Sequence, residues 1–197
     1  MPFVKVISYL WRRSTSGSLL SLCLVALVLL QGSQHVLAQA PSREYQLKAV
    51  FLFNFTQFVN WPDNAFENTQ SPLVIGVIGE NPFGSYLAQT VSGEKINGHP
   101  LAVQNYKNEE EIKSCHILFV NVAETKKQEQ VLEEVQGKNI LTVSDQPDFL
   151  KEGGMIRFVM NNNKIKLQIN MEACKESKMV LSSKLLRLAE IIKNPVK

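Results

Sequence analysis

Few residues of this chain are of the types that carry out chemistry, and their spacing favours structural roles. Beyond the first forty residues there are two histidines, His99 and His116, and two cysteines, Cys115 and Cys174. They lack the paired spacing of a zinc site. Cys115 adjoins His116, but neighbours on a strand point to opposite faces, so the two cannot readily form a thiol–imidazole dyad. No Gly-x-Ser-x-Gly nucleophile elbow occurs. We therefore expect a protein that is not an enzyme and that needs no metal or cofactor.

A glycine-containing turn is the second group of residues that could bind something. It follows an apolar run over residues 73–78 and contains Gly79, Asn81 and Gly84. A strand-to-helix turn can direct its backbone amides at an anion. The turn lacks the spacing of a dinucleotide-binding or phosphate-binding loop, and Glu80 would repel a phosphate. A tight connection is the simpler interpretation, and a small anion site at this turn is the alternative.

Two acidic residues, Asp145 and Asp148, are spaced like a pair of catalytic carboxylates. Asp145 also precedes Pro147, and proline is favoured in the first turn of a helix. Aspartate just before such a turn accepts hydrogen bonds from the free backbone amides. We therefore predict that Asp145 caps a short helix over residues 147–151.

The first 38 residues have the organisation of a secretory signal peptide. Lys5, Arg12 and Arg13 precede an apolar run over residues 19–30, and small residues end the segment at Ala38. The apolar run is shorter than the roughly 20 residues that cross a bilayer. We expect cleavage after Ala38, or two residues later, and export of the remaining chain.

Export changes the charge of the protein. The whole chain has 21 basic and 18 acidic residues, but three of the basic residues lie in the first 38. The remaining part is therefore balanced, with 18 of each sign. No basic stripe remains to neutralise phosphates, so the sequence does not favour a nucleic-acid-binding protein. The length suits one domain, which we place at residues 43–193.

An exported protein with two remaining cysteines is a candidate for one disulfide. Cys115 and Cys174 could form it. Alternatively, each could be a buried thiol that behaves as a small apolar side chain. The sequence leaves both interpretations open, because it does not give the distance between the two residues.

Apolar runs alternating with amphipathic segments predict an α/β fold, with a mixed, mainly parallel sheet flanked by helices. The predicted strands are at residues 73–78, 101–106, 117–120 and 139–143. The predicted helices are at 43–60, 82–91 (capped by Asn81), 124–135 and 147–151.

The end of the chain has a different pattern. Residues 155–160 and 164–169 flank three asparagines, which tolerate the backbone conformation of tight turns. In the second run, apolar and polar residues alternate, which is typical of an antiparallel strand. We predict a hairpin joined to the sheet. A terminal helix is predicted from Ser182, with Leu185 and Leu188 among its inward-facing residues.

Four residues are candidates for contact with a partner protein. Phe53 falls among the polar positions of the first helix, and Trp61 lies at its exit. Aromatic residues away from the core face mark contact surfaces in many proteins, although a neighbouring loop could equally cover them. Lys184 and Arg187 lie on the outward face of the predicted terminal helix and are the other two candidates.

The order and spacing of many segments resemble the YfiR family. The resemblance extends over nearly all of the chain after the first 43 residues. It is carried by residues 44–55, 58–62, 73–79, 81–84, 96–101, 115–120, 140–145, 153–158, 169–170 and 182–189.

This resemblance implies regulation in the periplasm. Founding members of the family bind the periplasmic sensor part of a membrane-bound diguanylate cyclase and hold it inactive until an outer-membrane lipoprotein sequesters them. By analogy, this chain would lower cyclic-di-GMP output and restrain biofilm formation, and it would form a homodimer. Disulfides stabilise relatives, but Cys174 does not match a usual family position. The alternative function is a periplasmic small-molecule binding module that feeds a membrane sensor kinase.

Overall fold

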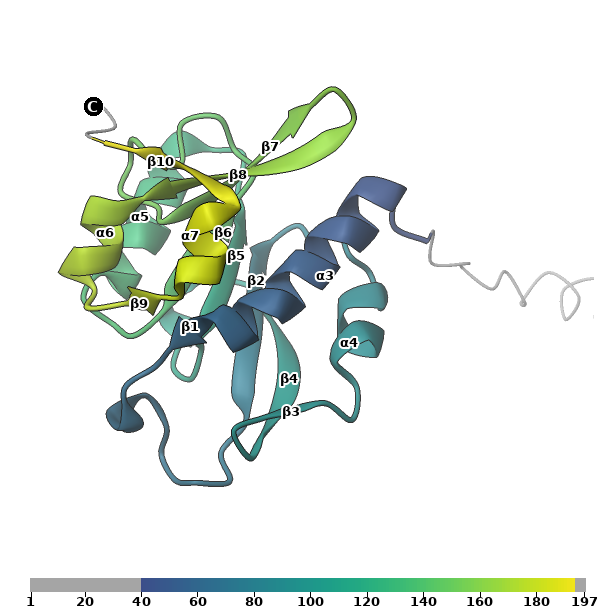
Figure 1. Ribbon diagram of the computed structural model, residues 1–197, viewed down its shortest axis with the longest axis vertical. Coiled ribbons are helices and arrows are strands. Elements are labelled where there is room, and N and C mark those ends of the chain that lie inside the picture. The colour runs from purple at the N-terminus through teal and green to yellow at the C-terminus, as the bar shows by residue number, and fades with distance from the viewer. Residues whose placement is uncertain (1–39, 194–197) are drawn as a thin grey trace, which may run out of the picture. The chain divides into compact units, whose positions relative to one another are not determined.

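The computed structural model describes residues 40–193, in which eight strands form one mixed sheet (Figure 1). The predicted signal peptide lies outside the described residues. From β4 to β7 the neighbouring strands run parallel, whereas β8 is antiparallel to β7, β10 is parallel to β8, and β3 is antiparallel to β4. In spatial order the strands are β10 (Ala189–Ile192), β8 (Lys164–Asn170), β7 (Ile156–Asn161), β6 (Leu141–Ser144), β5 (Ile117–Asn121), β2 (Leu73–Gly79), β4 (His99–Tyr106) and β3 (Lys95–Ile96).

The sheet is covered on both faces, which explains the continuous apolar runs in its central strands. In β5, Ile117 and Phe119 belong to one core, which we call the first core, while Leu118 and Val120 belong to the second core on the other face. Four helices contribute side chains to the first core: α3 (Arg43–Phe58), α4 (Tyr86–Val91), α6 (Met171–Glu176) and α7 (Ser183–Arg187). The second core is covered by α5 (Thr125–Val135). These layers confirm the predicted fold class.

Helix α3 crosses the first core and ends two residues earlier than predicted. Its N-cap is Ser42, whose hydroxyl accepts a hydrogen bond from the amide of Tyr45, and Leu52 and Phe55 are fully buried on its inner face. The helix ends because the next two residues become strand β1 (Val59–Asn60), which pairs antiparallel with β9 (Val180–Leu181). The segment after α3 is thereby joined to residues 180–181.

Two predicted helices differ in the structure. The helix predicted over residues 82–91 begins at Tyr86, because residues 82–85 form a turn in which Gly84 has a φ of 53°, outside the helical range. The helix predicted over residues 147–151 is a series of turns. The structure also contains two 3₁₀ turns, at Asp63–Ala65 and Glu109–Glu111.

The C-terminal hairpin is confirmed, with β7 and β8 in antiparallel register. Asn162 and Asn163 form its tip with φ angles of 49° and 57°, the pattern of a two-residue type I′ turn. The predicted long terminal helix is wrong, however. Helix α7 ends at Arg187, and the following residues form β10, because their backbone pairs with β8 at the edge of the sheet. Leu188 is consequently 66 % exposed instead of buried.

Candidate functional site

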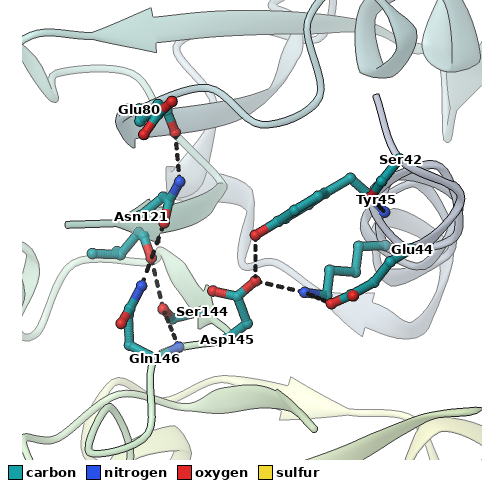
Figure 2. A network of polar contacts seen from close by, with 10 residues as sticks. Ser42, Glu44, Tyr45, Glu80, Asn121, Ser144, Asp145 and Gln146 are labelled. Atoms are coloured by element: carbon teal, nitrogen blue, oxygen red, sulfur yellow. Dashed lines mark hydrogen bonds and ion pairs between the residues drawn. The ribbon is translucent and has the colours of Figure 1, made fainter. Parts of the chain in front are cut away.

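A polar cluster lies where the parallel strands β2, β5 and β6 end (Figure 2). The chain leaves β2 for β4 on one side and later enters β5 on the other side, so the strand order reverses between β2 and β5. In open α/β sheets this reversal, at the carboxyl ends of the strands, is the usual place for a ligand. This edge is therefore the first candidate site.

Three α3 residues and Asp145 make up one half of the cluster. The Lys48 Nζ lies 2.5 Å from Asp145 Oδ2 and 2.5 Å from Glu44 Oε1. The Tyr45 hydroxyl donates a hydrogen bond of 3.1 Å to the same Asp145 oxygen, and the Lys48 ammonium lies 4.3 Å from the centre of the Tyr45 ring. Figure 2 shows the Tyr45 hydroxyl pointing at the Asp145 carboxylate from the helix. The predicted helix-capping role of Asp145 is therefore wrong, because its carboxylate faces α3.

The other half of the cluster joins the ends of three strands. Asn121 donates to the carbonyl of Glu80 at 2.9 Å, and Gln146 donates to Asn121 Oδ1 at 3.4 Å. Ser144 Oγ donates to the carbonyl of Val120 at 2.6 Å and accepts from the amide of Gln146 at 3.1 Å. These side chains therefore form hydrogen bonds with one another and with backbone groups at the ends of the neighbouring strands.

This cluster connects α3 to the sheet through hydrogen bonds and ion pairs. Burial, followed by the negative charge of Asp145, raises the pKa of Tyr45 to about 12. The phenol therefore stays neutral and acts as a hydrogen-bond donor at physiological pH. Together with the buried ion pair, it fixes the helix to the end of β6. The cluster contains no nucleophile with an adjacent base.

The glycine-containing turn lies beside this cluster. Asn81 Oδ1 accepts from the amide of Phe83 at 2.9 Å, and its Nδ2 donates to Asn105 at 2.9 Å and to the carbonyl of Gly84 at 3.4 Å. Gly79 has a φ of 88°. The Asn81 side chain thus closes the turn on itself, which supports the interpretation as a tight connection. The anion site at Gly79, Asn81 and Gly84 stays a prediction.

A second candidate site is a group of aromatic rings at the other end of the sheet. The Phe66 ring is stacked between His99 and His116, with ring centres 3.8 Å and 4.5 Å away. Trp61 meets His116 edge-on at 6.0 Å. A cavity of about 740 Å³ adjoins this group and is lined by Trp61, Phe66 and His99 together with residues of α3, the 67–69 loop and Asn97. The Trp61 Nε1 is buried and has no hydrogen-bond partner among the described residues.

His116 is a structural residue of this second site. Its Nδ1 accepts from the amide of Val74 at 3.2 Å, so its Nε2 carries the proton and donates to the carbonyl of Ala65 at 3.1 Å. Burial lowers the pKa of His116 to about 4. The neutral ring thus connects the sheet to the loop after α3. The neighbouring Cys115 thiol instead donates to the carbonyl of Ile117 at 3.1 Å, so the two residues form no dyad.

The structure also bears on the possible disulfide. Cys115 belongs to the second core and Cys174 to the first core, and both are free and buried. The sheet separates the two cores, so no bridge joins these cysteines in the structure. Of the two interpretations, the structure agrees with the second, in which each cysteine is a separate buried thiol. Within residues 40–193, no group of three histidine, cysteine or acidic side chains is arranged to hold a metal ion.

The four residues predicted to contact a partner lie in different environments. Phe53 and Trp61 are partly buried and pack against the first core. Lys184 and Arg187 are exposed on α7. Leu188, which the sequence pattern placed on the inward face of a helix, is the most exposed large apolar residue of the part of the chain that the structure describes. Its spacing from Leu185 suits a helix, and nothing local indicates that the helix stops before it.

A model of the YfiR/HmsC-like family matches residues 45–190. The chain belongs to this family. Family members are periplasmic regulators in cyclic-di-GMP signalling, which supports that role here. In residues 40–193, no helix has the length and apolar character needed to cross a membrane.

Other comparisons add little about function. No curated protein sequence matches this chain. Among solved structures, the chain is similar to the ABC domain in complex with L-Trp from Streptococcus pneumonia, with 12 % identity and a TM-score of 0.49. The alignment covers 76 % of this chain and 60 % of that one.

Proposed function

We propose that this chain is a periplasmic regulator that binds the sensor part of a membrane-bound diguanylate cyclase and represses it. The proposal depends on export of the chain after cleavage near Ala38 and on a folded domain over residues 43–193. Membership of the YfiR/HmsC-like family supports it. Such a regulator needs no catalytic group. It needs a surface that binds the inactive form of its partner more tightly than the active form.

The segment from α7 to β10 is the best candidate for that surface. Leu188 is 66 % exposed and Ile191 is 37 % exposed, and the same segment carries the exposed bases Lys184 and Arg187. An apolar centre beside charged residues is the usual composition of a protein interface. The observation that most supports the proposal is the exposure of Leu188, which directly precedes the edge strand β10.

The edge strand gives this surface a second means of binding. β10 pairs with β8 on one side and is the last strand of the sheet as far as residue 193. The free side of an edge strand can pair with an extended segment of a partner. A cyclase segment or a second copy of this chain could use it, and an outer-membrane lipoprotein that competes for the same surface would relieve the repression.

The test is co-purification of the exported protein with the periplasmic part of a candidate cyclase. Leu188→Glu should abolish co-purification, and Met160→Glu, an equally radical change at the exposed hairpin tip, should not. Unchanged urea denaturation of both variants would show that they fold. Deletion of the gene should raise cellular cyclic-di-GMP, and an unchanged level would contradict repression.

Phe53 and Trp61 are two further candidates for contact with the partner. Both rest partly on the first core, so they would contact a partner with one exposed edge. Trp61→Ala should weaken binding of the partner while the domain stays folded. If the variant instead unfolds, Trp61 acts in the core alone.

One observation favours a second function, a small-molecule binding module that feeds a membrane sensor kinase. The cavity of about 740 Å³ beside Trp61 has the size of a ligand site, and the buried Nε1 of Trp61 has no partner among the described residues. A thermal-shift screen distinguishes the two functions, because a specific ligand raises the melting temperature by mass action.

A further inference from the structure

Helix α3 is apolar on its outward side as well as on the side that faces the sheet. Its inner face buries Ala49, Leu52 and Phe55, whereas Leu47 is 47 % exposed and Val50 is 38 % exposed. Figure 1 shows α3 in front of the sheet, with no other described element over it. A helix that is apolar all round is normally buried all round, so another surface is expected to cover this side.

The outward residues form a stripe along the helix. Leu47, Val50, Asn54 and Phe58 follow one another at intervals of three, four and four residues, which places them along one side of an α-helix. We call these four residues the α3 stripe. Leu47 and Val50 are exposed, and Asn54 and Phe58 are partly exposed. An apolar stripe with this spacing is the surface by which one helix packs against another.

The α3 stripe carries no charge. Glu44 and Lys48 form an ion pair, and Lys48 also pairs with Asp145 at the end of β6. The remaining charged residue of the helix is Arg43, at its first position. A charged partner surface would lose its hydration against the stripe without gaining an ion pair. The surface that fits is another uncharged apolar one, and the α3 stripe of a second copy of this chain is such a surface.

The charges at the two ends of α3 favour one arrangement of two copies. The last turn of the helix contains no basic residue, so the partial negative charge of its end is not compensated from within the helix. A two-fold axis brings the same surface of both copies together. If the helices are antiparallel, Arg43 of each copy lies beside the uncompensated end of the other helix. A parallel arrangement would instead bring the two Arg43 side chains together.

We propose that two copies of this chain form a dimer through the α3 stripe, with the two helices antiparallel. Leu47 of each copy then lies against Phe58 of the other, because these residues are at opposite ends of the stripe. The second copy is thereby assigned to α3 and not to the edge strand β10. This dimer does not depend on the proposed binding of a cyclase.

Analytical ultracentrifugation of the exported protein tests the proposal. We expect the unchanged protein to have twice the mass of one chain at micromolar concentration. Leu47→Glu/Val50→Glu places acidic groups in the stripe of both copies and should reduce the mass to that of one chain. Cooperative thermal unfolding would show that this variant is folded. Leu188→Glu makes the same change at an exposed leucine before β10 and should leave the dimer intact.

Cysteine cross-linking tests the direction of the helices without disturbing the apolar residues. Asn54 lies near the centre of the stripe, so Asn54→Cys should form a disulfide-linked dimer under mild oxidation. In the antiparallel arrangement the two Arg43 residues are roughly 28 Å apart along the helix axis, so Arg43→Cys should form none. The unchanged protein is the control, because Cys115 and Cys174 are buried and should stay unlinked.

Several results would overturn the proposal. A mass of one chain for the unchanged protein would exclude the dimer. A dimer that persists in Leu47→Glu/Val50→Glu, or that only Leu188→Glu dissociates, would place the second copy at another surface. Cross-linking through Arg43→Cys and not through Asn54→Cys would contradict the antiparallel arrangement. If the protein is a single chain and the stripe variant no longer co-purifies with the cyclase, the cyclase occupies the stripe.

Discussion

Lys48 and Asp145 are 97 residues apart in the chain, and their side chains form a 2.5 Å ion pair in which the lysine is only 3 % exposed. The pair joins the first helix of the domain to the end of β6. Breaking such a pair leaves one charge buried without a partner, which costs about 3–5 kcal/mol. We therefore expect Lys48→Met to lower the free energy of unfolding by about 3 kcal/mol in urea denaturation.

The matched control is an exposed pair of the same kind. Lys138 and Glu134 are 2.6 Å apart, but about half of each side chain is exposed. Lys138→Met should change the unfolding free energy by less than about 1 kcal/mol, because water screens an exposed pair. Equal losses for the two variants would show that the Lys48–Asp145 pair does not hold the helix.

The ion pair also shows what the sequence could not predict. Lys48 lies within an amphipathic helix pattern, and nothing local identifies Asp145 as its partner. Asp145 precedes a proline, so a helix cap was the simplest local expectation. The long-range pair forms instead because Asp145, directly after β6, lies against Tyr45 and Lys48 near the start of α3.

The helices and strands were predicted correctly where the local sequence pattern matches the structure that the segment adopts in the fold. The buried strands and the asparagine turn of the hairpin were recognisable because their patterns are local. Strand β10 was not, because residues 189–192 are compatible with a helix and become a strand only by pairing with β8. The proposed function rests on family resemblance, since no local pattern in the sequence indicates it.

Gly79 is predicted to be intolerant of a side chain. Its φ is 88°, and a Cβ added there would collide with the carbonyl oxygen of Asn121 in the neighbouring strand. Backbone atoms in the centre of a sheet cannot move aside easily. We expect Gly79→Ala to lower the unfolding free energy through two effects, backbone strain at positive φ and overpacking. The overpacking should add roughly 2 kcal/mol to the loss that the backbone strain causes alone.

Gly93→Ala separates the effect of backbone strain from the effect of the collision. Gly93 has a similar φ of 78°, but a Cβ there would meet no atom within 4 Å. It should therefore show the backbone strain of about 1–2 kcal/mol without the collision. If urea denaturation gives the same loss for both variants, the close approach of Asn121 has no energetic consequence.

His116 should make the stability depend on pH. Burial lowers its folded-state pKa to about 4 from an ordinary value of 6.5, so the unfolded state binds the proton more readily. The stabilisation is complete above about pH 6.5 and is lost as the pH falls toward 4. Protonation of Nδ1 would also break the hydrogen bond from Val74.

The measurement is the melting temperature between pH 4 and pH 7.5 for the unchanged protein and for His116→Gln. Glutamine can accept and donate as the neutral ring does, but it does not titrate. Carboxylates contribute to both curves, so the difference between them isolates His116. The curves should converge toward low pH, and parallel curves over the whole range would contradict this role.

The two cysteines should behave as protected thiols. Burial raises the pKa of Cys115 and that of Cys174 to about 12, so the reactive thiolate is scarce at neutral pH. In the protein purified without reductant, a maleimide should label them roughly a hundredfold more slowly than an exposed cysteine introduced by Ser92→Cys. In urea, mass spectrometry should find both native cysteines labelled without prior reduction. Labelling in urea that needs a reductant would instead reveal a bridge, and would mean that the sheet does not keep the two thiols in separate cores.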